Sequence, residues 1–217
     1  MSDCCSDKAQ EIARLRGGQS RVLRTVLAIN GAMFCIEFAA GVIARSTALM
    51  ADSVDMFGDA LVYALSLYVI NRGPRARAGA AVVKGMVILA FGVWILIEAG
   101  AKLVEGVTPV APLMAAFGAV ALMANLVCLK LLWPLRSLDI NMRSTFECSR
   151  NDVISNVGVL LASVGVWLTD SSWPDIAVGL IVASLFLRSA VSVLRQAWPE
   201  VRAKNPDITN VDPERRS

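Results

Sequence analysis

The chain has 217 residues, of which 56% are hydrophobic and 18% are charged, and its mean hydropathy is +0.59. Soluble domains are about half apolar and a quarter charged, so this composition excludes an ordinary soluble fold and predicts an integral membrane protein. The net charge of +3, without a dense basic run, argues against a nucleic-acid partner.

Apolar runs of about twenty residues, long enough to cross a hydrocarbon core of about 30 Å, recur along the whole chain. In chain order they predict transmembrane helices at 22–44, 48–70, 79–104, 111–133, 145–168 and 173–194. Turns that contain Gly, Pro or small polar residues separate them. The predicted fold is therefore an all-α bundle of six transmembrane helices in a lipid bilayer.

The two ends of the chain are polar. Residues 1–20 have no apolar core of the kind that a cleavable signal requires, so they are expected to form a cytoplasmic N-terminal segment. Residues 21–195 are expected to form the six-helix transmembrane domain. Residues 196–217, rich in Pro and charge, are expected to form a short disordered tail on the same side, too short for a further folded domain.

The positive charges predict the orientation. Of the 21 Lys and Arg residues, only Arg45 and Lys102 belong to the connections on one side of the predicted bundle. Lys and Arg favour the cytoplasmic side of short loops. Both termini are therefore expected in the cytoplasm, with the bundle in the inner (plasma) membrane.

Acidic residues interrupt the predicted spans, although a charged side chain near the bilayer centre costs at least about 2.5–3.5 kcal/mol. We expect no Lys or Arg deep in the bundle to compensate them, since Lys84, near the start of the predicted helix at 79–104, is counted among the charges that surround the preceding connection. A cationic cargo would supply the missing charge. These acids are Glu37, Asp52, Asp55, Asp59, Glu98, Glu147 and Asp152.

Two pairs of these residues have the spacing of ligands on one helical face. Asp55 and Asp59 are four residues apart, and so are Cys148 and Asp152. A thiolate is a soft ligand that favours zinc and similar ions, and zinc prefers four tetrahedral ligands. The pattern predicts a metal site made of these four residues, if the two helices meet.

Other interpretations of the same residues stay open. Each acid could be a protonated packing residue, an alternative most plausible for Asp52, which is kept as a secondary ligand candidate. Cys148 could be a small core residue, as Cys35 and Cys128 are expected to be. Glu147, the other secondary candidate, could attract cations at the cytoplasmic mouth. Cys4 and Cys5 have no assigned role.

With these motifs the chain resembles the cation diffusion facilitator family of metal/proton antiporters. The resemblance covers about residues 20–195 and is carried by the Asp55-x-x-x-Asp59 and Cys148-x-x-x-Asp152 pairs, together with the following matches. They are Asn30, Phe34-Cys-Ile-Glu37, Gly41, Ser46-Thr-Ala-Leu-Met-Ala-Asp52 and Ser155-Asn-Val.

The resemblance implies a homodimer that exports Zn²⁺ or Cd²⁺ from the cytoplasm in exchange for protons, with no permanent cofactor and no enzymatic activity. The four paired residues would be its metal ligands. Many members have His in the first place of these pairs, whereas this chain contains no His. The rival interpretations are a proton-coupled organic-cation exporter and a non-transporting membrane metal sensor or scaffold.

Overall fold

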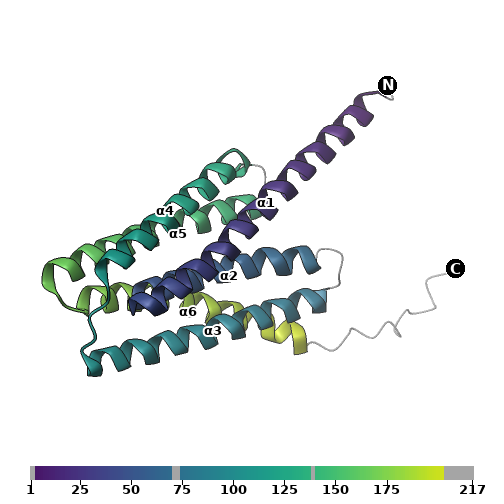
Figure 1. Ribbon diagram of the computed structural model, residues 1–217. Coiled ribbons are helices and arrows are strands. Elements are labelled where there is room, and N and C mark those ends of the chain that lie inside the picture. The colour runs from purple at the N-terminus through teal and green to yellow at the C-terminus, as the bar shows by residue number, and fades with distance from the viewer. Residues whose placement is uncertain (1–2, 70–73, 138–139, 203–217) are drawn as a thin grey trace.

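The computed structural model describes residues 3–69, 74–137 and 140–202, and these residues contain helices and no strand. The elements run antiparallel through one bundle (Figure 1). In chain order they are α1 (Asp3–Ala44), α2 (Thr47–Val69), α3 (Pro74–Glu105), α4 (Ala111–Leu132), a 3₁₀ turn η1 (Trp133–Leu135), α5 (Ile140–Thr169) and α6 (Trp173–Arg202). The predicted all-α bundle of six long helices is confirmed.

Four helices extend beyond the apolar runs that predicted them: α3 and α5 begin five residues earlier, and α1 and α6 extend further. α1 is continuous from Asp3, so most of the expected N-terminal segment is helical, and α6 continues to Arg202, past residue 195 where the expected tail begins. The length of an apolar run predicts only the part of a helix that lies in lipid. The helical hydrogen bonds of the backbone can continue beyond it into polar sequence. The side chains of Cys4 and Cys5 and all of 203–217 lie outside the described residues.

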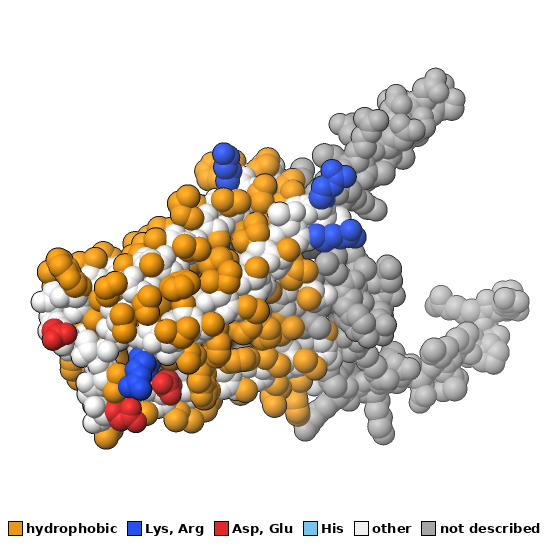
Figure 2. All heavy atoms as spheres, viewed as in Figure 1, with side chains coloured by type: hydrophobic (Ala, Val, Ile, Leu, Met, Phe, Trp, Pro, Cys, Tyr) orange, Lys and Arg blue, Asp and Glu red, His pale blue; other side chains and the backbone are white. Residues whose placement is uncertain are grey.

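Five helices, α1, α3, α4, α5 and α6, contain stretches long and apolar enough to cross a membrane within the described residues. Large hydrophobic side chains point outward from them, including Val104, Trp167 and Ile97. On the face shown in Figure 2, hydrophobic side chains cover the middle of the bundle and charged ones lie toward its ends. α2 is the exception, because Asp52, Asp55 and Asp59 interrupt its apolar sequence.

The helices pack as close pairs, with α3 against α6, α4 against α5 and α1 against α2. The first pair is tight because α3 carries glycine where α6 approaches. A Cβ at Gly85 would lie 2.6 Å from Cγ of Leu194, and a Cβ at Gly92 would overlap Leu187. Small residues allow this approach between membrane helices, where no hydrophobic effect drives association. α2 also contacts α3, α5 and α6, so it lies at the centre of the bundle.

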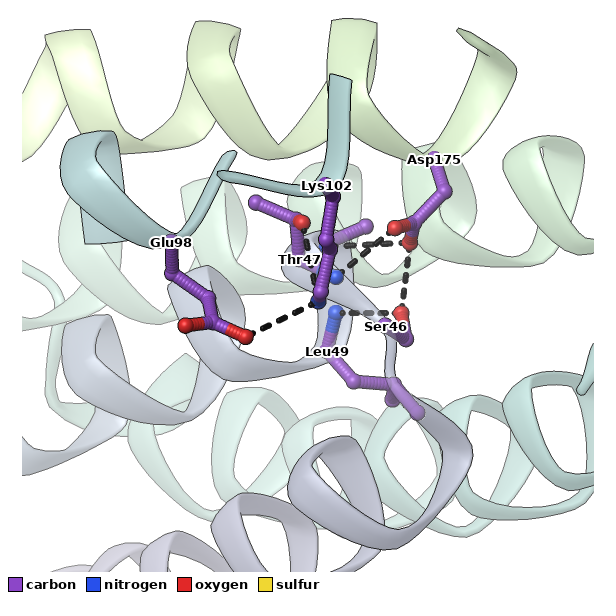
Figure 3. A network of polar contacts seen from close by, with 7 residues as sticks. Ser46, Thr47, Leu49, Glu98, Lys102 and Asp175 are labelled. Carbon is purple, nitrogen blue, oxygen red and sulfur yellow. Dashed lines mark hydrogen bonds and ion pairs between the residues drawn. The ribbon is translucent and has the colours of Figure 1, made fainter. Parts of the chain in front are cut away.

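A hydrogen-bonded network joins α2, α3 and α6 at the end of the bundle where α2 begins (Figure 3). The carboxylate of Asp175 accepts hydrogen bonds from Ser46 Oγ at 2.6 Å, from Thr47 N at 2.7 Å and from Ala48 N at 3.0 Å. Lys102 Nζ donates to Thr47 Oγ1 at 3.1 Å. An acid on α6 therefore caps the first turn of α2, where unpaired N–H groups and the helix dipole favour negative charge.

The network also gives Glu98 a partner, since one of its carboxylate oxygens lies 3.9 Å from Lys102 Nζ. At the same end, α1, α3 and α5 are each followed directly by a residue with positive φ: Arg45 (54°), Gly106 (65°) and Asp170 (48°). Such residues end helices by turning the chain away from the helical path. This end of the bundle is held by short, well-bonded connections.

Candidate metal-transport site

All four residues of the predicted site line one cavity of about 810 Å³. Asp55 and Asp59 come from α2, and Cys148 and Asp152 from α5. In each helix the two residues are one turn apart, so their side chains leave the same helical face. The structure thus brings together the two pairs that the sequence could only place on separate helices.

The cavity has a polar and an apolar wall. The polar wall holds the four residues already named together with Lys84 of α3 and Asn151 and Ser155 of α5. The apolar wall is formed mainly by α6. Its lining residues there are Val178, Ile181, Val182, Leu185, Phe186 and Ser189. Pockets of this kind use a few polar groups to bind and orient a ligand.

Two of the carboxylates have buried oxygens without a hydrogen-bond partner. Asp152 is only 4% exposed, and its Oδ2 has no donor; Oδ2 of Asp59 is in the same situation. The carbonyl oxygen of Asp152, by contrast, accepts a hydrogen bond of 2.7 Å from Asn156 Nδ2. Buried acceptors are nearly always paired, because leaving one unpaired costs about 1–3 kcal/mol. A cation in the cavity would satisfy both oxygens.

The four residues do not yet form a coordination shell. Within the described part of the chain, no three Cys, Asp or Glu side chains lie close enough together to hold one metal ion. Zinc requires its ligands at about 2.0–2.3 Å. The facing pairs on α2 and α5 therefore have to approach each other before all four could bind one ion.

The two secondary candidates do not line the cavity. Asp52 is buried, interacts electrostatically with Glu37 and Asp55, and leaves its Oδ2 unpaired. Glu147 is exposed, and its Oε1 accepts a hydrogen bond of 3.1 Å from Nε of Arg143. Glu37, which had no assigned role, is completely buried. Its two carboxylate oxygens have no hydrogen-bond partner.

Lys84 is the residue that the sequence reasoning misplaced. It was grouped with the charges that surround the connection before the third helix, and no basic residue was expected near the acids. It instead lies in the cavity wall and interacts electrostatically with Asp55, Asp59 and Cys148. The available signal was a lysine inside an otherwise apolar helical run, a position that needs an acidic partner.

The model of the cation efflux transmembrane domain matches residues 23–200 of this chain. The chain belongs to this family. The match covers every helix of the bundle and both pairs of cavity residues, and it confirms the resemblance to the cation diffusion facilitators. The cation efflux family is one of transporters and not of enzymes.

Several curated relatives of the cation efflux family are similar to the chain. The metal cation efflux system protein CzcD of Cupriavidus metallidurans is 25% identical over 203 residues, which cover 85% of this chain and 64% of CzcD. The zinc transporter ZitB of Pectobacterium atrosepticum is 26% identical over 218 residues, covering 94% of this chain and 68% of ZitB. The cadmium, cobalt and zinc/H⁺–K⁺ antiporter of Bacillus velezensis is 23% identical over 217 residues, covering 90% and 68%.

The chain thus spans a little under two thirds of the length of CzcD. What the relatives are named for, metal efflux and cation antiport, is a property of longer proteins.

Proposed function

We propose that this chain is the membrane-embedded transport unit of a metal exporter, which moves Zn²⁺ or Cd²⁺ out of the cytoplasm in exchange for protons. Asp55, Asp59, Cys148 and Asp152 are its metal ligands. The observation that carries this proposal is the shared cavity, in which two acids from α2 face a thiol and an acid from α5. Buried, unpaired carboxylate oxygens in a membrane bundle favour a cationic ligand.

The choice of ion rests on the sulfur. Carboxylates alone would suit magnesium or calcium, whereas a thiolate shifts the preference toward zinc and cadmium. The relatives named for zinc and for cadmium support the same choice. An organic cation would bind through aromatic contacts in addition to an acid, and Phe186 is the one aromatic residue among the cavity-lining residues described.

Exchange with protons follows from the chemistry of the ligands. A thiol and carboxylic acids bind metal only after losing their protons, so metal binding releases protons and proton binding releases metal. Two of the polar lining residues, Lys84 and Cys148, lie in about the first third of α3 and of α5, toward the end of the bundle where α2 ends. With that end in the cytoplasm, the Asp175 network closes the outer end of the same helices.

The proposal is tested by zinc uptake into proteoliposomes that contain the wild-type chain or Asp152→Asn. The substitution keeps the size of the side chain and removes one charged ligand, and we expect it to lower initial uptake by at least about ten-fold. Glu105→Gln is the matched control, because it makes the same acid-to-amide change at an exposed residue at the end of α3.

Uptake by Asp152→Asn at the wild-type rate would show that Asp152 is not a ligand. Metal binding without uptake by the wild-type chain would identify a sensor or scaffold and contradict transport.

A further inference from the structure

Lys84 is a cation built into the proposed metal cavity, at a position that no ligand motif explains. It is located five residues after Gly79, where the apolar stretch of α3 begins, which places it roughly 7.5 Å into that stretch. A lysine inside the apolar stretch of a membrane helix is costly unless acids face it. Here Asp55 and Asp59 of α2 provide that compensation.

The lysine is close to the acids but is not bound to one of them. Its ammonium group makes no ion pair within 4.0 Å with any carboxylate among the described residues. Its side chain is half-buried in the cavity wall. A lysine side chain is a flexible four-carbon stem that ends in a compact point charge. Its positive charge therefore interacts with several groups of the cavity and is not neutralised by one ion pair.

Lys84 offsets part of the negative charge of the proposed ligands. With Asp55, Asp59, Asp152 and the thiol of Cys148 all deprotonated, the ligands carry four negative charges, and one divalent ion together with Lys84 offsets three of them. Without the lysine, the same ligands would hold a divalent ion with two excess negative charges. The larger excess would strengthen binding and slow release, which is the opposite of what a transport site requires.

We propose that Lys84 is a tethered competitor of the transported metal ion, which weakens metal binding in the cavity and thereby speeds release. This inference rests on the proposed function, since it takes the metal to bind at Asp55, Asp59, Cys148 and Asp152. Lys84 repels the bound ion and, when the ion leaves, its ammonium group compensates the acids. It tunes affinity without being a ligand.

Zinc titration calorimetry on the purified chain in detergent tests the inference, with release rates measured after mixing with a chelator. At an effective dielectric constant of about 20, a unit charge about 10 Å from a divalent ion changes its affinity by ten-fold or more. We therefore expect Lys84→Gln to lower the Kd for zinc by about ten-fold and to slow release. Lys84→Met, which also removes the charge, should do the same.

Two further variants distinguish the effect of the positive charge in the cavity from the effect of a lysine substitution as such. Lys84→Arg keeps the positive charge and should leave the Kd near that of the wild type. Lys130→Gln makes the same substitution at an exposed lysine of α4, away from the cavity, and should leave both the Kd and the release rate unchanged.

The inference is overturned if Lys84→Gln and Lys84→Met bind zinc with the wild-type Kd or more weakly, or if Lys84→Arg behaves as Lys84→Gln does. Asp152→Asn, measured in parallel, distinguishes this failure from that of the proposed function. If Asp152→Asn loses zinc binding while Lys84→Gln does not change it, the site stands and only the role of Lys84 is wrong. If Asp152→Asn binds normally, the site itself is wrong.

Discussion

Cys148 is the residue that separates zinc and cadmium from harder ions in the proposed site. It lines the cavity, and its side chain is accessible, unlike that of Cys128, which is 1% exposed and packs with Val26 and Leu132. A buried cysteine of that second kind is a small core residue. The two environments support the expectation that Cys148 binds ions and that Cys128 fills space.

Replacing the sulfur by oxygen should change which ion is preferred. Cys148→Asp keeps a ligand with a carboxylate, which suits zinc better than it suits the softer cadmium ion. In proteoliposomes loaded with a metal-sensitive dye, we expect cadmium uptake to fall several-fold more than zinc uptake. Cys35 was expected to be a core residue but is exposed on α1 and does not line the cavity, so Cys35→Ser is the control. An equal loss for both ions would show that the sulfur is not a ligand.

At the scale of single residues, the sequence was sufficient for the acid and thiol pairs but not for Lys84. The spacing of Asp55 with Asp59 fixes their common face, because that depends only on helical geometry. Whether Lys84 faces the cavity or lipid depends on the rotation of α3, which is set by its contact with α6 at Gly85. No local pattern contains that information.

At the scale of helices, the first turn of α2 is the element most dependent on a distant residue. Its N–H groups at Thr47 and Ala48 are bonded to Asp175, more than a hundred residues later in the chain. α2 carries two of the proposed ligands, Asp55 and Asp59. Its position is therefore fixed from outside by α6.

Asp175→Asn should loosen this junction. The Asp175 carboxylate is the acceptor in all three of these hydrogen bonds. An amide would replace one acceptor oxygen by an NH₂ group, which would face a donor. We expect the free energy of unfolding to fall by about 1–3 kcal/mol, seen as a lower Tm in thermal denaturation in detergent. Asp170→Asn, an exposed residue whose positive φ suits Asn equally well, is the control. Equal Tm values for the two variants would exclude a structural role for the Asp175 charge.

The bounds of the helices were predictable to different degrees. For α2 and α4 the apolar runs ended within a residue of the observed helices, because turns follow directly. For α1, α3, α5 and α6 they did not, because these helices continue into polar sequence. The capping of α2 by Asp175 was not predictable, since no pattern in the sequence indicates that the start of α6 lies beside the start of α2.

At the scale of the whole molecule, six helices that cross the bundle return the chain to the side from which it started. The start of α1 and the end of α6 lie at the same end of the bundle (Figure 1). This agrees with the distribution of Lys and Arg, which predicts that end in the cytoplasm. The pairing of α3 with α6 and of α4 with α5 could not be predicted, because lipid-facing and helix-facing surfaces are both apolar.

Metal movement across the whole molecule should respond to a proton gradient. Protons compete with metal for the thiol and the carboxylates, so an acidic interior on the release side should accelerate metal delivery there. We expect zinc uptake into vesicles with an acidic lumen to be several-fold faster than into vesicles of equal pH. A protonophore, which collapses the gradient, is the control. Uptake that is indifferent to the gradient would contradict proton exchange.

Gly179 of α6 contacts the start of α2 directly. A Cβ at Gly179 would lie 2.7 Å from Thr47 Cγ2 and 2.9 Å from its carbonyl carbon, so the two helices touch there with no spacing side chain. Asp59 is twelve residues further along α2, about 18 Å away. A tilt of α2 by about 10° about this contact would move Asp59 by about 3 Å, more than the length of a zinc–oxygen bond. A rotation of that size at one end of α2 would be enough to assemble or dismantle the coordination of an ion at the other.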